Sequence, residues 1–405
     1  MDAYVARQPI LDRKMKAYGY ELLFRSGAAE KNSMVTDADQ ATSRVVMESF
    51  FSRGLENITG GKLAFVNFTS RLLLEGAATL FPKEQLVVEI LEDVEPEPEI
   101  IEACRNLYDR GYTLAMDDFV YRPELDPLIE LSQVIKFDFM LSTPDEISDM
   151  LKKFPIKGKQ LLAEKIETNE MFVLAEKMGF SLFQGYFFSK PVTYTTKTLS
   201  PLKASYISLL REINQEEELD FERLGVTIRG DVALSYKLLK LVNSSYYGLR
   251  NQVKDVTQAL AIIGTREIRK WVFMISLMGL SSDKPDEIIK MSMIRGRFLE
   301  NLNMRWLREL SSENAFQTGL FSLLDILMDM PMESAIEGIL LPDQVRDALI
   351  EGRGHLYDML DLAISIERSD WDKVEETTGS LRLDAAHVSE EYLGAIKWCN
   401  EIPYL

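Results

Sequence analysis

One stretch limits most strongly what this chain can fold into. Tyr112 to Arg122 reads YTLAMDDFVYR, an apolar run that follows Gly111 and ends in two adjacent carboxylates, Asp117 and Asp118. A short apolar run of this kind is typical of a strand buried on both faces. A buried strand that ends in acids predicts a site at the mouth of a barrel or at the edge of a parallel sheet. The alternative is that both aspartates only cap a following helix.

The region from Tyr4 to about Pro191 alternates short apolar runs with helix-like segments such as 98–110 and 169–178. Only Asp12 to Lys16 separates the first two runs, which predicts a hairpin. The strand candidates are Tyr4–Leu11, Tyr18–Phe24, Leu63–Phe68, Leu86–Leu91, Tyr112–Met116, Val134–Phe139, Gln160–Glu164 and Leu182–Phe187. Because strand–helix alternation implies a parallel sheet, these runs predict a modified (β/α)8 TIM-like barrel with some shortened helices.

Polar side chains stand at or near the C-terminal ends of the candidate strands. They are Glu21, Asn67, Glu89, Asp117, Lys136, Glu164 and Gln184. In a barrel these ends meet on one face, so the groups are predicted to surround one mouth. Oxygen ligands suit Mg²⁺ or Mn²⁺, and divalent cations relieve the repulsion between crowded carboxylates. A two-metal site could activate water and stabilise the leaving oxygen of a phosphodiester.

These residues resemble the EAL domain, whose members hydrolyse or bind the bacterial messenger cyclic di-GMP. The resemblance covers nearly the whole first half of the chain. It is carried by Gln8-Pro9-Ile10, Glu21-Leu22-Leu23-Phe24-Arg25, Val66-Asn67-Phe68, Glu89-Ile90-Leu91-Glu92, Asp117-Asp118-Phe119, Lys136 with Asp138, Ala163-Glu164-Lys165-Ile166-Glu167 and Gln184-Gly185-Tyr186.

The resemblance implies a role for each matching residue. Glu164 would be the general base for the attacking water, with Lys136 beside it. Arg25 would meet a ligand phosphate, which suits a planar guanidinium. Gln8 and Gln184 are the further ligand-binding candidates. The implied metal shell consists of Glu21, Asn67, Glu89, Asp117, Asp118 and Glu167.

Two departures from the family pattern bear on activity. The alanine of the Glu-Ala-Leu motif is Leu22 here, away from the metal shell. In addition, active members follow the paired aspartates with a Gly-rich loop of the form DDFGxGxSS, where this chain has Val120, Tyr121, Arg122 and Pro123. Val and Pro cannot copy the positive φ angles and close backbone approach of glycine. We therefore expect the metal set to be present but catalysis to be impaired, with Glu92 deprived of its loop partner.

The second half is predicted to be all-helical. The Thr- and Pro-rich stretch PVTYTTKTLSP reads as a linker, and we place domains at 1–192 and 202–405 with the linker at 193–201. Ile268, Trp271, Val272 and Ile275 repeat at the helix period and form a core face. Arg266, Arg269 and Lys270 are predicted to lie on a solvated face. Other predicted helices are 202–213, 231–242, 285–309, 312–328, 332–339 and 356–365.

The run from Asp231 to Gly248, with 256–264 and 266–275, resembles the HDOD domain, a relative of the HD phosphohydrolases. The chemistry of those relatives needs several histidines to hold metal. The chain has only His355 and His387, both far beyond the matching run. We therefore expect a module for protein interaction or output, in which Asn243, Tyr246, Tyr247 and Gly248 form a helix end and turn.

Composition removes other classes of function. A net charge of -18 and a pI of about 4.8 argue against binding nucleic acid or an anionic membrane. The N-terminus MDAYVARQP has no apolar h-region, and Trp271–Leu280 is about half as long as a spanning helix. Cys104 and Cys399 form neither a metal-ligand spacing nor a disulfide framework. We expect a cytoplasmic protein.

Three functions stay open on the sequence. The preferred one is a bacterial EAL–HDOD signalling protein whose impaired EAL domain binds cyclic di-GMP or metal and whose HDOD domain engages a protein partner. The second is a working metal-dependent cyclic di-GMP phosphodiesterase, supported by the intact ligand set. The third is an interaction scaffold that binds no nucleotide. A homodimer is compatible with each of them.

Overall fold

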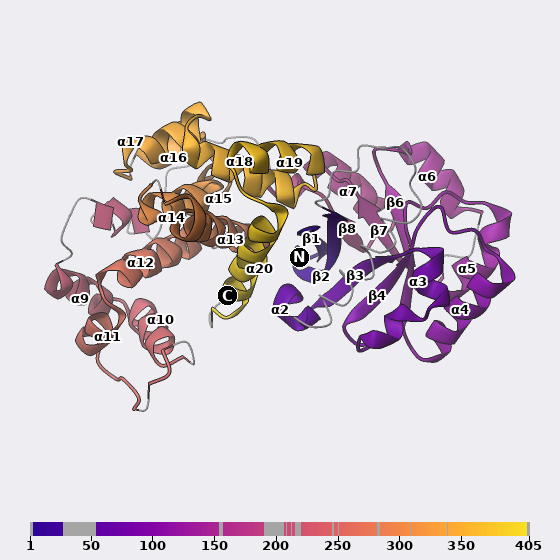
Figure 1. Ribbon diagram of the computed structural model, residues 1–405, viewed down its shortest axis with the longest axis horizontal. Helices are drawn as coiled ribbons and strands as arrows, with labels where there is room; N and C mark the ends of the chain where they lie inside the picture. Colours follow the sequence, from indigo (N-terminus) through magenta and orange to yellow (C-terminus); the bar gives the residue numbers. More distant parts are fainter. Residues whose placement is uncertain are drawn as a thin grey trace. The chain divides into compact units, whose positions relative to one another are not determined.

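The computed structural model describes most of the chain, as two compact units. The described residues are 3–26, 54–153, 157–189, 206–207, 209–211, 213–214, 220–244, 247–249, 251–281, 284–308, 310–337 and 339–402. The barrel unit is Met1–Lys190 with Ile364–Leu393, and the helical unit is Pro191–Ala363 with Gly394–Leu405 (Figure 1). The predicted division gave all residues after 201 to the second domain, whereas the structure groups Ile364–Leu393 with the barrel. The predicted linker 193–201 lies outside the described residues.

The strands of the barrel unit follow the predicted order closely. They are β1 Ala3–Asp12, β2 Ala17–Ser26, β3 Leu63–Phe68, β4 Leu86–Ile90, β5 Thr113–Met116, β6 Val134–Asp138, β7 Gln160–Glu164 and β8 Leu182–Gln184. The sheet closes in sequence order from β1 to β8, with β1 pairing back to β8. Strands β2 to β8 run parallel, while β1 is antiparallel to both of its neighbours. The prediction of a modified (β/α)8 barrel is confirmed.

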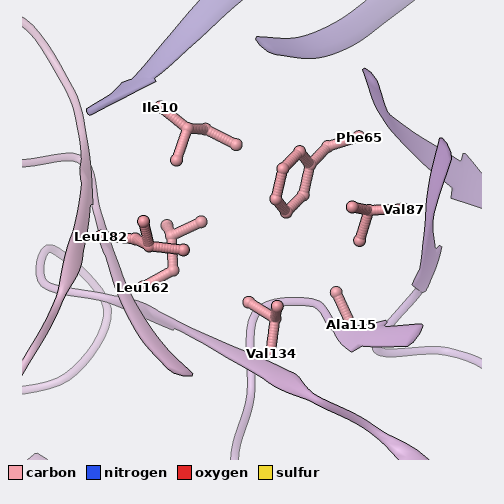
Figure 2. Packing of buried hydrophobic residues seen from close by; sticks show 7 residues of the cluster. All are labelled: Ile10, Phe65, Val87, Ala115, Val134, Leu162 and Leu182. Atoms are coloured by element: carbon pink, nitrogen blue, oxygen red, sulfur yellow. The ribbon is translucent and has the colours of Figure 1, made fainter. Parts of the chain in front are cut away.

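The barrel interior is filled by one layer of apolar side chains. Seven strands each contribute one residue to it, namely Ile10, Phe65, Val87, Ala115, Val134, Leu162 and Leu182, and these side chains point toward one another in Figure 2. Strand β2 contributes Gly19 at this level, where a Cβ would collide with the Phe65 ring. Because this layer is a packed core, ligands can enter only at the ends of the barrel.

Short helices connect the strands. In the barrel unit they are α2 Leu55–Thr59, α3 Ser70–Leu74, η1 Ala77–Leu80, α4 Pro98–Asp109, η2 Pro123–Leu125, α5 Asp126–Leu131, α6 Pro144–Leu151, α7 Asn169–Lys177 and η3 Phe187–Ser189. The capping box of α6, in which Thr143 and Glu146 satisfy each other's backbone N–H groups, shows how local sequence fixes these starts. Helix α19, Trp371–Ser380, belongs to the same unit although it follows the helical half in the sequence.

The described part of the helical unit contains helices and no strand. They are α9 Phe221–Gly230, α10 Val232–Val242, α11 Val256–Ile263, α12 Thr265–Leu280, α13 Asp286–Leu302, η4 Asn303–Leu307, α14 Ser312–Phe321, α15 Leu324–Met328, α16 Met332–Glu337, α17 Asp343–Arg346 and η5 Asp347–Glu351. The division between the units falls within α18, His355–Glu367, and α20, Ala385–Asn400. None of the helices in the described part is long and apolar enough to cross a membrane.

Two expectations for the helical half have different outcomes. Asn243 ends α10, and its side chain bonds the backbone of Val253 through both its amide and its carbonyl, so the predicted helix end is confirmed. The prediction of a solvated basic face is wrong for Arg269 and Lys270, which are only 8% and 4% exposed. Their burial is possible because Lys270 pairs with Glu300 at 2.6 Å and Arg269 donates to the Ile213 carbonyl at 2.8 Å.

Candidate functional site

The site residues are set by the two-residue period of the strands. Side chains two positions apart on a strand point to the same face, so the residue two positions from each core residue also points into the barrel. On β3 to β8 these residues are Asn67, Glu89, Asp117, Lys136, Glu164 and Gln184, each two positions after a member of the apolar layer. On β2 the same spacing leads from Gly19 to Glu21, and on the antiparallel β1 it leads backward from Ile10 to Gln8. The register therefore places one polar residue from each strand at the C-terminal mouth.

Lys136 lies at the centre of this polar ring. Its Nζ is 2.6 Å from Glu89 Oε1, 2.7 Å from Asp117 Oδ1, 2.9 Å from Glu164 Oε1 and 3.5 Å from Glu21 Oε1. The side chains of Lys136 and Glu89 are fully buried, and the other three carboxylates are at most 12% exposed. One ammonium group therefore faces four acids in a region of low dielectric, which leaves negative charge in excess.

The excess of acid shifts the titration of the buried groups. Burial raises the pKa of Glu164 to about 8, with Lys136 opposing the shift and Asp117 and Glu21 adding to it. Burial likewise raises the pKa of Glu89 well above its usual value. For Lys136, burial by itself lowers the pKa, but the surrounding carboxylates, Glu164 first, raise it well above the usual value. A divalent cation among these oxygens would favour the charged carboxylates.

A chain of amide side chains extends the ring to one side. Gln184 Nε2 donates to Glu21 Oε2 at 2.6 Å and to Gln8 Oε1 at 2.9 Å. Gln8 Nε2 in turn donates to the Glu367 carbonyl at 3.1 Å and to Ser369 Oγ at 3.2 Å. Both predicted ligand-binding glutamines therefore serve to orient neighbouring groups, and they connect Glu21 to the turn that precedes α19.

A cavity of about 700 Å³ opens above the ring, within the range of about 300–1,000 Å³ that is usual for small-molecule sites. Most of the predicted site residues line it: Gln8, Glu21, Asn67, Asp117, Asp118, Glu164, Glu167 and Gln184. Glu89 and Lys136 lie beneath this lining and contact it through the ion pairs described above. The prediction that acids scattered along the sequence meet at one mouth is thus met in the structure.

The donor set fits divalent cations. Ligand oxygens of Asp117, Asp118 and Glu164 lie within 4.8 Å of one another. The Oδ1 atom of Asn67 is buried without a hydrogen-bond partner in the described part of the chain. A buried oxygen without a partner costs free energy of folding unless a bound ligand or cation interacts with it. Burial and the neighbouring Asp117 raise the pKa of Asp118, a cost that a cation would remove. Hard oxygen donors of this kind suit Mg²⁺ or Mn²⁺.

The loop after the paired aspartates is held without glycines. Asp118 itself adopts φ 37°, a left-handed conformation that is uncommon for residues other than glycine. The next residue, Phe119, is buried, and its N–H donates to the Lys136 carbonyl at 3.0 Å. Arg122 then pairs with Glu95 at 3.2 Å before Pro123 begins η2. Glu92, which the sequence predicts to have lost its loop partner, is exposed, and its charge contributes to raising the pKa of Asp118.

Arg25 is the predicted site residue that the structure places apart from the others. Its guanidinium pairs with Asp372 at 3.0 Å and lies 3.9 Å from Glu375, both on α19. Arg25 is not among the described residues that line the cavity. The phosphate-binding role implied by the family resemblance therefore has no support in this geometry.

Sequence reasoning missed several residues of the cavity wall. Lys165 and Tyr186 lie within the quoted family motifs, and their place in the motifs was the available signal. Arg368 and Ser369 come from the turn between α18 and α19, and they also line the cavity. No periodicity or motif connects this turn to the barrel, because the contact spans nearly the whole length of the chain.

The helical unit offers no comparable metal site in its described residues. Among all described residues of the chain, one group of acids is arranged as potential metal ligands, and that group lies at the barrel mouth. His355, in the helical unit, begins α18, whereas His387 belongs to the barrel unit, where it pairs with Asp384 one helical turn away at 3.1 Å. Cys104 and Cys399 are both buried. The interaction role predicted for this half stays a prediction.

Comparison with known proteins identifies the family. The HDOD domain family matches residues 199–329. The protein YuxH of Bacillus subtilis is 37% identical over 99% of this chain and 99% of its own length. The cyclic di-GMP phosphodiesterase CdgJ of Vibrio cholerae is also 37% identical, over 98% of this chain and 93% of its own length. The chain therefore belongs to the same family as YuxH and CdgJ and has the EAL–HDOD architecture that the sequence predicts.

Solved structures of EAL domains are more distant. An EAL domain protein from Listeria monocytogenes is 22% identical, covers 47% of this chain and 89% of its own, and has a TM-score of 0.38. The calcium and cyclic di-GMP complex of Klebsiella pneumoniae BlrP1 is 21% identical over 47% of this chain and 56% of its own, also with a TM-score of 0.38. The family assignment depends on the full-length relatives and not on these likenesses.

Proposed function

We propose that the barrel unit binds cyclic di-GMP together with Mg²⁺ or Mn²⁺ in the cavity above Lys136, and that its turnover of the nucleotide is impaired. In this proposal the protein acts in the cytoplasm, and its HDOD domain passes the signal to a protein partner. The observation that carries the proposal is the ring of polar side chains, one from each strand, which meet around Lys136. Membership in a family that includes a cyclic di-GMP phosphodiesterase supports the choice of ligand.

The residues present can hold the cations and prepare a phosphodiester for attack. Asp117, Asp118, Glu21 and Asn67, with Glu89 and Glu167, would hold the metal. When bound, a pair of divalent cations activates water and stabilises the leaving oxygen. Glu164 would accept the proton of the attacking water, and Lys136 at 2.9 Å favours its charged form. Gln184 orients Glu21 by donating to its Oε2.

Impaired turnover is supported by the loop that follows the metal-ligand candidates Asp117 and Asp118 and by the ion pairs of Arg25. Val120 and Arg122 stand where active members have the glycines of the DDFGxGxSS loop, and Asp118 adopts a left-handed conformation without glycine's freedom. In addition, Arg25 is paired with Asp372 and Glu375. Catalysis depends on ligand placement, since an error of about 1 Å can cost about 100-fold in rate.

The alternative is a working phosphodiesterase. It is favoured by the complete set of carboxylates around Lys136 and by the relation to CdgJ over almost the whole chain. By contrast, a scaffold that binds no nucleotide leaves the convergence of these side chains without a reason.

One experiment separates the three functions. The full-length protein and its Glu164→Ala variant are incubated with cyclic di-GMP and excess Mg²⁺ or Mn²⁺, and both nucleotide binding and linear product are followed. Glu99→Ala, which removes an exposed acid from the first turn of α4, is the matched control. We expect binding with little product in every sample. Turnover that Glu164→Ala abolishes and Glu99→Ala preserves would establish the phosphodiesterase, and absence of binding would overturn the proposal.

A further inference from the structure

The turn from Glu367 to Asp370 forms part of the cavity wall in the barrel unit. Its backbone closes the C-terminal end of α18 with two hydrogen bonds, from Ser369 N–H to the Ile366 carbonyl at 2.9 Å and from Asp370 N–H to the Ser365 carbonyl at 2.9 Å. This pattern is the Schellman motif, in which the residue corresponding to Ser369 is usually glycine. Ser369 instead adopts the left-handed conformation with φ 57°, so the turn is held at some cost in strain.

The barrel supplies the contacts that offset this cost. Gln8 donates to both the Glu367 carbonyl and Ser369 Oγ. Next to the turn, Trp371 stacks on Tyr4 of β1 with ring centroids 6.3 Å apart and an interplanar angle of 26°. The turn is thus fixed to β1 on both sides of Ser369. Arg368, between these contacts, is held at the cavity while its side chain stays exposed.

Arg368 differs from the other cations of the site in its electrostatic surroundings. Lys136 lies among four carboxylates, and Lys165 contacts Asp138. Arg368 has no carboxylate partner among the described residues; its guanidinium lies over the Tyr186 ring, 5.6 Å from the ring centroid. Stacking on an aromatic face restrains a guanidinium and leaves its N–H edge available to an anion. A phosphodiester needs such a cation, because the rest of the cavity wall is strongly acidic.

Arg25 does not take this role in the structure. Its guanidinium forms ion pairs with two acids of α19, Asp372 and Glu375, and it does not line the cavity. Its place in the structure is that of a positioning residue that helps to hold α19 beside β2.

We propose that Arg368 is a ligand-binding residue of the barrel site and meets a phosphate of the bound cyclic dinucleotide. The inference rests on the function proposed above, since it assigns a contact within the same cavity. It makes the site composite: the metal ligands come from the strands, and the cation for the phosphate comes from the turn before α19.

The test measures the affinity of the full-length protein for cyclic di-GMP by calorimetry in the presence of Mn²⁺, with the affinity for Mn²⁺ alone measured on the same samples. The variants are Arg368→Ala, Arg368→Lys and Arg25→Ala. Arg105→Ala is the control, because it removes the same charge from the exposed side of α4 away from the cavity. We expect Arg368→Ala to weaken nucleotide binding at least tenfold and Arg368→Lys to weaken it less. Binding of Mn²⁺ should stay unchanged in both.

Arg25→Ala is expected to change nucleotide affinity less than threefold, because Gln8 and Tyr4 still hold the turn. The inference is overturned if Arg368→Ala binds the nucleotide as the unaltered protein does, or if the tenfold loss occurs in Arg25→Ala instead. Either result leaves the proposed function intact. If the unaltered protein binds Mn²⁺ but no cyclic di-GMP, the proposed function itself fails and the inference fails with it.

Discussion

The two units bury charge in opposite ways. In the barrel unit, one ammonium group, that of Lys136, lies among four carboxylates. In the helical unit, one carboxylate, that of Glu300, is fully buried among three cations: Arg266 at 2.9 Å, Lys270 at 2.6 Å and Arg297 at 2.7 Å. Both oxygens of Glu300 are paired, and Lys270 has a second partner in Glu267.

The difference distinguishes a structural charge cluster in the helical unit from a candidate binding site in the barrel unit. Burial by itself raises the pKa of Glu300, but Lys270 and Arg297 lower it below the usual value, so the carboxylate is stable in its charged form. At the barrel mouth, by contrast, the pKa of Glu164 and that of Glu89 are raised, because acid is in excess. A cluster whose charges are matched stabilises the fold, whereas unmatched acids beside a cavity indicate a site for an added cation.

The largest expected effect is that of Glu300→Ala. Removing the carboxylate leaves Lys270 and parts of two arginines buried without their shared partner. We expect the free energy of unfolding of the helical unit to fall by about 3 kcal/mol, as is usual when one partner of a buried ion pair is lost. Urea unfolding measures this change, and added Mg²⁺ or Mn²⁺ should restore none of it. Glu313→Ala, which removes a partly exposed partner 3.7 Å from Arg269, is the control. A loss under 1 kcal/mol for Glu300→Ala would contradict the structural role.

Lys136→Met should lower the free energy of unfolding in EDTA by less than Glu300→Ala does, and added metal should restore part of the loss. The four acids lose their cation but can take up protons, so we expect a loss of about 2 kcal/mol, below the range for a broken buried pair. Mn²⁺ should restore at least half of this loss, because a divalent cation can replace the ammonium charge. The readout is the urea midpoint of the barrel unit with and without Mn²⁺. Equal midpoints in both conditions would remove the distinction between the two clusters.

Asn67→Ala should affect metal binding more than stability. The buried Oδ1 of Asn67 has no partner among the described residues, so its removal should change the free energy of unfolding in EDTA by less than about 0.5 kcal/mol. As a ligand it should nevertheless contribute, and we expect the affinity for Mn²⁺ to fall about tenfold. Calorimetry with Mn²⁺ measures the affinity, and Asn106→Ala on α4 is the matched amide control. An unchanged affinity would exclude Asn67 from the metal shell.

The smallest expected effect is a pH dependence of opposite sign in the two units. The raised pKa of Glu164 means that its contribution to stability is present below about pH 4.5 and is lost as the pH rises toward 8. The lowered pKa of Glu300 means that its contribution is present above its ordinary pKa and is lost as the pH falls below it. We therefore expect the melting temperature of the barrel unit in EDTA to decline between pH 5 and 8, and Glu164→Gln to flatten that decline. A rise over this range would show that other groups dominate.

The sequence predicted the barrel and its acidic mouth because both depend on local patterns. An apolar run with a polar residue at its end, such as Gln160–Glu164, identifies both the strand and the face to which the last side chain points. The burial of Arg269 and Lys270 was not predicted, because helical spacing cannot show that Lys270 pairs with Glu300 of another helix or that Arg269 donates to the Ile213 carbonyl. The role of the turn at Arg368 was likewise hidden, since its partners Gln8 and Tyr186 lie far away in the sequence.

The return of Ile364–Leu393 to the barrel unit has a consequence for how the protein is made. The strands of the barrel and their acidic ends leave the ribosome long before the turn at Glu367 and Ser369, which bonds Gln8, has been translated. The same holds for Trp371, which stacks on Tyr4. Domains generally fold as units during synthesis, with the N-terminal one first. In this protein the cavity wall of the barrel unit can be completed only after residues near the end of the chain have been synthesised. The HDOD domain is therefore synthesised before the barrel unit has its complete cavity wall.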